Sequence, residues 1–325
     1  MLARSVLLPT CLKALPARGF ACKVCAAAAP PQPKQRLNNG LEMPLFGLGT
    51  WKSKGGALET SVRTALESGY RHIDCASAYS NQDTVGKTFQ EVFAEGTVAR
   101  DDIWVTSKLF NKDHARVREA WPVLKPSIKE TWQDMEKLVD DGLVKSIGIS
   151  NFSVKKTQHL LGYARIKPVA NQVELHPYFR NCATADFCQA ENILITAYSP
   201  LGSNDSEQMF GREGIPKVLD DETVLSIAQD LGWTPAQVLC RWSLQHGYST
   251  IPKSVSPQRI RENLEVVGME LPAKHFDQLN NLEFQIRMLD GNFTTGPNTP
   301  YPTINELWDG EVPEENLKRR GLVAA

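Results

Sequence analysis

The chain has 325 residues, of which 42% are hydrophobic and 22% are charged, and its formal net charge at pH 7 is −1. This length is sufficient for one large α/β barrel or for two smaller domains with well-buried cores. The near-neutral charge gives no reason to expect a nucleic-acid partner. The sequence holds no run of 18 or more apolar residues, so we expect no membrane span.

The first 41 residues contain no Asp or Glu, carry several Lys and Arg residues, and are rich in Ala and Leu. A basic segment without acidic residues is typical of an organelle transit peptide. Pro9, Lys13 and Pro16 interrupt the apolar stretch that a secretory signal would need. We therefore expect residues 1–36 to direct the protein to a chloroplast or a mitochondrion. The alternative is a disordered leader on a cytoplasmic protein.

Short apolar strands alternate with amphipathic helices from Leu45 onward. The expected strands are Leu45–Thr50, Arg71–Cys75, Ile103–Leu109, Val144–Ser150, Pro168–Leu175, Ile193–Tyr198 and Ser249–Lys253. The expected C-terminal helices lie near Val224–Leu231, Pro235–His246, Pro257–Val267 and Ala273–Leu282, followed by a polar tail. This alternation predicts a parallel sheet, and so many repeats favour one α/β domain over residues 37–325, a TIM-type (β/α)8 barrel. No Gly-x-Gly-x-x-Gly motif follows a strand, which disfavours a Rossmann domain.

The strand count is one short of the eight that a TIM barrel requires. Between the strands at Ile103–Leu109 and Val144–Ser150 there is room for only one loop and one helix. The loop contains Pro122, which cannot donate a hydrogen bond within a central strand. We therefore predict that one βα unit is missing between Lys108 and Trp121. The barrel would then contain seven strands, recruit residues of this loop, or stay open with unpaired strand edges.

Side chains that could carry chemistry stand at the C-terminal ends of the predicted strands, where barrel enzymes place their active sites. Asp74 ends the second strand, Tyr79 lies five residues further on, and Lys108 ends the third strand. An ammonium favours a nearby phenolate and lowers the pKa of the phenol, and a carboxylate keeps that ammonium charged. These residues predict a relay in which Tyr79 protonates a carbonyl oxygen as hydride reaches the carbon. The alternative is a structural Lys–Asp pair beside a surface tyrosine.

Several strings of residues occur in order along the chain. They are Gly69-Tyr70-Arg71-His72-Ile73-Asp74, Tyr79 with Asn81 and Gly86, Ser107-Lys108-Leu109, Gly148–Phe152, Asn171–Tyr178, Tyr198–Gly202, and Ile251–Ser254 followed by Arg259, Glu262 and Asn263. Together they closely resemble the aldo-keto reductase superfamily, and its plant and algal members in particular, from about Gln35 to the C-terminus. The resemblance implies a monomeric barrel that reduces aldehydes and ketones to alcohols with NADPH, producing NADP⁺.

The resemblance also implies roles for individual residues. Tyr79 would be the general acid, Lys108 the group that lowers its pKa, and Asp74 the partner of Lys108. The nicotinamide end of the cofactor would lie against Thr50, Trp51, Ser150, Asn151, Gln172 and Tyr198. The pyrophosphate would be covered by Ser199, Leu201 and Ser203. The 2′-phosphate would be held by Lys253, Ser254 and Arg259, and adenine by Glu262 and Asn263.

The substrate would lie in an apolar, aromatic pocket. Its expected residues are Trp51, Phe110, Trp121 and the C-terminal segment around Phe293–Trp308, which would form a substrate loop. Cys22 and Cys25 form a single C-x-x-C in the expected leader, which is a weak signal for metal or redox chemistry. The cysteines from Cys75 onward show no ligand spacing, and we expect no metal.

One catalytic residue of the family is absent. The family places a histidine before a Trp-Pro pair, where it polarises the carbonyl, but here Ala120 precedes Trp121 and Pro122. Loss of one such donor costs a factor of about 10²–10³ in rate. His72 shares the strand face of Asp74, and we interpret it as a packed interior histidine rather than a replacement. The alternative function is therefore an inactive NADP(H)-binding relative that acts as a sensor or a partner subunit.

Overall fold

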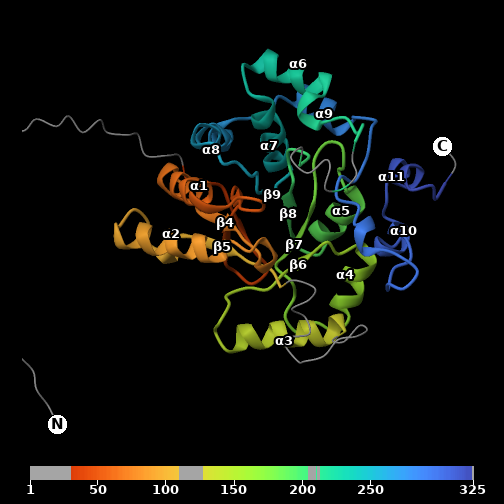
Figure 1. Ribbon diagram of the computed structural model, residues 1–325, viewed down its shortest axis with the longest axis horizontal. Helices are drawn as coiled ribbons and strands as arrows, with labels where there is room; N and C mark the ends of the chain where they lie inside the picture. The colour runs from red at the N-terminus through yellow and green to blue at the C-terminus, as the bar shows by residue number, and fades with distance from the viewer. Residues whose placement is uncertain (1–30, 110–126, 204–209, 211–212, 324–325) are drawn as a thin grey trace, which may run out of the picture.

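The computed structural model describes residues 31–109, 127–203, 210 and 213–323 (Figure 1). Most of the expected transit peptide lies outside the described residues. So do Phe110, Ala120, Trp121 and Pro122.

The body of the protein is a barrel of short parallel strands surrounded by helices (Figure 1). The strands are β3 (Leu48–Gly49), β4 (His72–Asp74), β5 (Trp104–Thr106), β6 (Ile149–Ser150), β7 (Ala170–Glu174), β8 (Leu194–Tyr198) and β9 (Ser249–Thr250). They confirm the seven predicted strands, each with shorter bounds. Strands β3-β4-β5 form one sheet and β6-β7-β8-β9 another. A parallel bridge from Phe46 to Thr250 joins the two sheets beside β3 and β9.

The second boundary between the two sheets has no such bridge. Among the described residues, β5 pairs with β4 alone and β6 pairs with β7 alone. Within the described residues the wall therefore has a break between β5 and β6, the interval in which the sequence predicts a missing βα unit. Trp104 of β5 and Ile149 of β6 line a cavity at this break.

Helices cover the outside of the barrel. They are α1 (Gly55–Ser68), α2 (Gln82–Ala94), α3 (Ile128–Asp140), α4 (Val154–Leu161), α5 (Cys182–Ala190), α6 (Glu222–Leu231), α7 (Pro235–Gln245), α8 (Pro257–Leu264) and α9 (Ala273–Asn280). Helix α3 begins with a capping box, in which the Ser127 hydroxyl accepts from Glu130 N at 3.2 Å and the Glu130 carboxylate accepts from Ser127 N at 2.8 Å. These two bonds satisfy backbone donors that a helix start leaves free.

Four short elements are absent from the sequence-based expectations. The C-terminal tail, expected without helices, contains α10 (Ile304–Leu307) and α11 (Glu314–Arg319), which are too short to show helical periodicity. A hairpin of β1 (Lys34–Arg36) and β2 (Glu42–Pro44) precedes the barrel. Since residues 34–36 form a strand, folded structure begins before the expected domain boundary at residue 37. Leu37 and Met43 of this hairpin pack against Val169 beside the start of β7.

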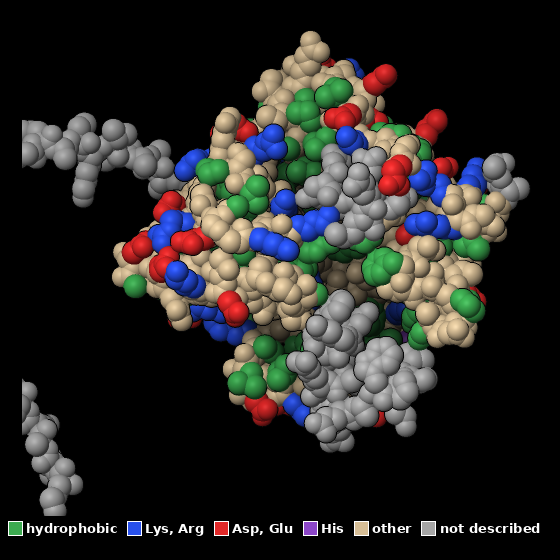
Figure 2. All heavy atoms as spheres, in the orientation of Figure 1, with side chains coloured by type: hydrophobic (Ala, Val, Ile, Leu, Met, Phe, Trp, Pro, Cys, Tyr) green, Lys and Arg blue, Asp and Glu red, His purple; other side chains and the backbone are tan. Residues whose placement is uncertain are grey.

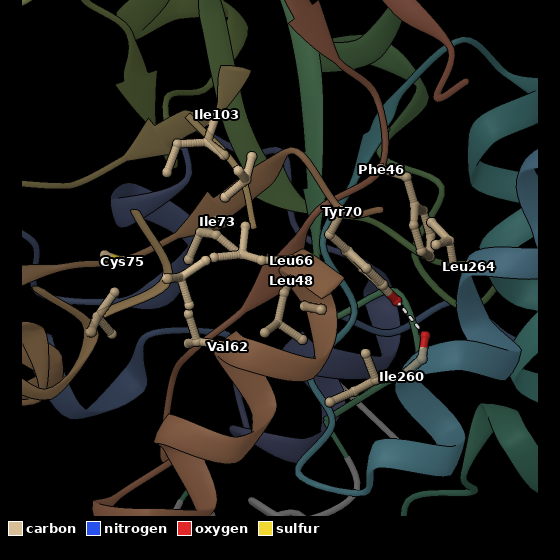
Figure 3. Packing of buried hydrophobic residues seen from close by; sticks show 14 of the residues in the cluster. Phe46, Leu48, Val62, Leu66, Tyr70, Ile73, Cys75, Ile103, Ile260 and Leu264 are labelled. Carbon is tan, nitrogen blue, oxygen red and sulfur yellow. Dashed lines mark hydrogen bonds between the residues drawn. The ribbon is translucent and has the colours of Figure 1, made fainter. Parts of the chain in front are cut away.

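Part of the core lies between α1 and the first strands (Figure 3). Val62 and Leu66 of α1 pack in the same cluster as Ile73 of β4. The Tyr70 hydroxyl donates a hydrogen bond to the Ile260 carbonyl at 2.8 Å, which ties β4 to α8. These contacts hold the C-terminal end of β4, and therefore Asp74, in a fixed place.

His72 is a fully buried residue of β4, as the sequence predicts. Its Nε2 lies 3.0 Å from the Thr106 hydroxyl. The ring also lies against Gly47, where an added Cβ would come within 2.7 Å of Nδ1. Position 47 therefore accepts only glycine without a shift of the histidine.

Acid is expected to destabilise the protein through His72. Burial lowers the pKa of this imidazole to about 4, against 6.5 for an ordinary histidine. Between these pH values the unfolded chain binds a proton that the native protein excludes, so the stability is complete above pH 6.5 and falls as the pH drops to 4. The expected loss is about 3 kcal/mol. Denaturant unfolding across this range should show a smaller loss for His72→Gln than for the surface control His159→Gln, and equal losses would contradict the assignment.

Candidate active site

The three predicted catalytic side chains lie together at the C-terminal end of the barrel. Asp74 ends β4, Lys108 follows β5, and Tyr79 ends a 3-10 helix, η1 (Ser77–Tyr79). Lys108 Nζ lies 2.7 Å from both carboxylate oxygens of Asp74, and it donates to the Tyr79 hydroxyl at 3.2 Å and to the Cys75 carbonyl at 2.9 Å. The ammonium therefore connects the buried carboxylate with the phenol.

The pKa of Tyr79 departs from the expectation. Burial raises the pKa of this phenol well above its usual value, and the carboxylate of Asp74 raises it further. The net pKa is therefore raised although Lys108 Nζ lies 3.2 Å from the hydroxyl, and the lowering effect assigned to Lys108 stays a prediction. At neutral pH the phenol is consequently protonated, which is the form that a proton donor requires.

Polar neighbours hold this group in place. Gln172 Nε2 donates to Asp74 Oδ1 at 2.9 Å. The buried Thr50 hydroxyl donates to the Asp74 carbonyl at 2.7 Å. Asn81 Nδ2 donates to the carbonyls of Thr50 and Ser53 at 2.9 and 3.0 Å, so it fixes the turn that carries Trp51. The sequence motif includes Asn81 but does not predict this structural role. Its position two residues after Tyr79 is the one feature of the sequence that points to it.

One cavity of about 1980 Å³ joins this group to the predicted cofactor residues. The predicted residues in its lining are Trp51, Asp74, Tyr79, Lys108, Ser150, Asn151, Gln172, Tyr198, Ser199, Leu201, Ser203, Lys253, Ser254, Arg259, Glu262 and Asn263. Thr50 is not among the described residues that line it. The volume exceeds the roughly 300–1,000 Å³ of common ligand sites, and the lining also includes Trp104 of β5 and Ile149 of β6. Figure 2 shows the molecule hollowed near its centre, with Lys and Arg side chains beside the hollow.

The donor set of this cavity fits a nicotinamide dinucleotide. At one end the Tyr198 hydroxyl donates to Asn151 Oδ1 at 2.9 Å, and the amide of Gln172 lies in the same lining. Amide side chains can both donate to and accept from a carboxamide. Lys253 and Arg259, in the same lining, supply cationic donors, which suit a phosphate.

Aromatic rings line the substrate side of the cavity. The ring centroids of Trp51 and Phe210 lie 6.0 Å apart, and those of Phe210 and Phe293 lie 5.7 Å apart. Tyr301 and Trp308 of the C-terminal segment belong to the same lining, as the sequence predicts. Phe210 was missed because its surroundings in the sequence show no periodic pattern. The predicted substrate residues Phe110 and Trp121 lie outside the described residues.

Two further properties concern the described ranges only. They contain no group of three His, Cys, Asp or Glu side chains arranged to hold a metal ion. None of their helices is long and apolar enough to cross a membrane.

Comparison with known proteins identifies relatives of nearly the same extent. The chain is 39% identical over 312 residues to an aldo/keto reductase of Synechocystis sp., covering 84% of this chain and 95% of that protein. It is 37% identical over 313 residues to aldo-keto reductase family 4 member C11 of Arabidopsis thaliana, covering 85% and 98%. The solved aldose reductase from Schistosoma japonicum superposes with a TM-score of 0.70 at 34% identity, covering 79% and 94%. The two alignments extend over 312 and 313 positions but include only 84% and 85% of this chain's 325 residues. Each relative therefore has residues that are missing from this chain.

A family model supports the same relationship. The model described as the aldo/keto reductase family matches residues 45–123 and 114–283. The match is divided at residues 114–123, close to the predicted junction of the missing unit. The chain therefore belongs to the aldo/keto reductase family and is an oxidoreductase of the TIM-barrel fold that acts on carbonyl compounds with a nicotinamide cofactor.

Proposed function

We propose that this protein reduces aldehydes and ketones to alcohols with NADPH, and that Tyr79 donates the proton. The observation that carries the proposal is the hydrogen bond from Lys108 Nζ to the Tyr79 hydroxyl at 3.2 Å, in a cavity that extends to Lys253 and Arg259. The bound cofactor supplies the hydride that reaches the carbonyl carbon. Tyr79 supplies the proton that the carbonyl oxygen takes up, so the product is the alcohol.

The neighbours of Tyr79 support this role. When the phenol gives up its proton, negative charge develops on its oxygen, and Lys108 Nζ lies beside that atom. Asp74 keeps the ammonium charged and oriented through contacts of 2.7 Å from both carboxylate oxygens. The aromatic rings of Trp51 and Phe293 favour an apolar carbonyl compound on the substrate side.

The specificity for NADPH is expected to depend on Lys253 and Arg259. Since a hydrogen bond to a charged group contributes about 1.5–3 kcal/mol, Lys253→Met and Arg259→Met should each weaken NADPH binding about 10- to 100-fold. The affinity for NADH, which lacks the 2′-phosphate, should stay nearly constant. Fluorescence titration with both cofactors measures the difference. Arg261→Met is the matched control, because Arg261 lies on the same helix but is not among the described residues that line the cavity.

The proposed activity is tested by NADPH oxidation with purified protein and a panel of small and aromatic aldehydes. Because the chain has Ala120 where the family has histidine, the rate is expected to lie about 10²–10³ below that of a complete relative. No oxidation, with thermal stabilisation by NADPH, would favour a second candidate: a relative that binds NADP(H) as a sensor or partner subunit. The observation that favours this candidate is that β5 and β6 have no strand paired between them in the part of the chain that the structure describes. Without oxidation and without stabilisation, both candidates fail.

A further inference from the structure

Arg287 is a buried cation in the segment between α9 and α10. Only 2% of the residue is exposed. Its guanidinium carbon lies 4.2 Å from the ring centroid of Phe179 and 3.5 Å from a ring centroid of Trp308. Phe179 belongs to the loop that follows β7, whereas Trp308 follows α10. The guanidinium therefore lies between a ring of the barrel and a ring of the C-terminal segment.

The backbone around Arg287 is tied to the same two parts of the molecule. Met288 N and Leu289 N donate to the two carboxylate oxygens of Glu174, at the end of β7, at 2.5 and 2.8 Å. The side chain of Asn316, on α11, brackets the backbone of Arg287 with two hydrogen bonds of 2.8 Å. The segment is thus fixed between the catalytic end of the barrel and the last helix.

The residues next to this stack form one wall of the active-site cavity. The residues of this wall are Leu289, Gly291, Phe293, Thr294, Tyr301, Leu307 and Trp308. The Trp308 indole donates to the Asp290 carbonyl at 2.7 Å, so the ring on the guanidinium is also bonded to the chain just after Arg287. A shift of Arg287 would therefore move the wall, although Arg287 is not among the described residues that line the cavity.

Arg287 combines an electrostatic interaction with the buried Glu174 carboxylate with contacts to two aromatic rings. Its Nε and Nη1 are buried and have no hydrogen-bond partner among the described residues. The guanidinium nevertheless interacts electrostatically with the fully buried carboxylate of Glu174, so an apolar residue in its place would leave that carboxylate without its cation. The planar guanidinium can stack on the rings of Phe179 and Trp308 at the same time. The ring contacts thus give Arg287 a role in fixing the geometry of this region, beside its charge interaction with Glu174.

We propose that Arg287 is a positioning residue that fixes the C-terminal wall of the cavity against the barrel, and so determines the affinity for carbonyl substrates with a bulky apolar part. This rests on the proposed function. A small aldehyde reacts at Tyr79 without reaching the wall, whereas an aromatic aldehyde of two fused rings contacts it. Loss of Arg287 should therefore change the KM for the large substrate and leave turnover of the small one nearly constant.

The experiment compares propanal with 2-naphthaldehyde in the full chain saturated with NADPH. For Arg287→Met, the KM for 2-naphthaldehyde should rise about tenfold, which corresponds to about 1.4 kcal/mol, while kcat and KM for propanal stay within about twofold. Arg287→Lys keeps the positive charge but loses the planar guanidinium. It should therefore also raise the KM for 2-naphthaldehyde while leaving the constants for propanal nearly unchanged. Phe179→Leu removes the barrel-side ring without altering the described cavity lining, so it should reproduce the split even if the Arg287 variants do not fold.

Leu239→Ala is the control for general destabilisation, since Leu239 is buried in the core and is not among the described lining residues. It should leave the ratio of the two KM values unchanged. The proposal would be overturned if the Arg287 and Phe179 variants lost activity equally with both aldehydes. It would also be overturned if the ratio of their two KM values stayed as in the wild type.

The proposal stays testable if the wild-type protein shows no turnover. Binding of 2-naphthalenemethanol and 1-propanol to the NADP⁺-saturated protein is then measured by thermal shift. The same selective loss for the larger alcohol supports the role of Arg287 although the proposed reductase activity has failed. Equal binding of 2-naphthalenemethanol by wild type and variants rejects it.

Discussion

Tyr79→Phe is expected to lower kcat/KM for aldehyde reduction by a factor of about 10²–10⁴, the usual contribution of a general acid. The variant keeps the ring and loses only the hydroxyl that Lys108 Nζ contacts at 3.2 Å. The affinity for NADPH should not change, because Tyr79 is not among the residues predicted to contact the cofactor. Steady-state kinetics with one aldehyde, together with cofactor titration, measures both quantities.

Two comparisons sharpen this experiment. Tyr163→Phe is the matched control, since the Tyr163 hydroxyl has no hydrogen-bond partner among the described residues and its ring packs elsewhere. Because the pKa of Tyr79 lies above its usual value of 10.0, kcat/KM of the wild type should not fall through loss of the Tyr79 proton between about pH 6 and pH 9. If kcat/KM of the wild type falls with rising pH in this range, and the fall disappears in Tyr79→Phe, then the pKa of Tyr79 is lowered below 10.0, as Lys108 is predicted to do. An undiminished rate in Tyr79→Phe would remove the proposed proton donor.

Lys108→Met is expected to affect both stability and activity. The side chain of Asp74 is only 3% exposed, and removing the ammonium would leave its carboxylate buried without a cation. Breaking such a pair costs about 3–5 kcal/mol, and the lower end applies here because Lys108 retains 20% exposure. Activity should fall as well, since no cation would remain beside the phenolate that forms on Tyr79.

The double variant Asp74→Asn with Lys108→Met separates the two effects. Removing both charges should restore most of the free energy of unfolding while the activity stays low. Denaturant unfolding and NADPH oxidation are measured on the single and double variants. If the single variant is as stable as wild type, or if the double variant regains activity, the role assigned to this pair is wrong.

Much of the fold followed from local patterns. The alternation of apolar strands and amphipathic helices predicted the seven barrel strands, and the interval between Leu109 and Val144 predicted where the wall would be broken. The capping box at Ser127 and Glu130 located the start of α3, because those bonds involve residues only three positions apart. The hairpin of β1 and β2 and the helices α10 and α11 were missed, since elements of three to six residues carry too little periodicity.

The sequence by itself determined that Asp74, Tyr79 and Lys108 would meet, because the carboxyl ends of parallel strands gather at one end of a barrel. Only the tertiary structure decided the protonation of Tyr79, since a pKa depends on burial and on the full set of neighbouring charges. The stack of Arg287 between Phe179 and Trp308 likewise depends on contacts between residues far apart in the chain. A local pattern can place a residue at an end of the barrel, but only folding decides which charges and rings surround it.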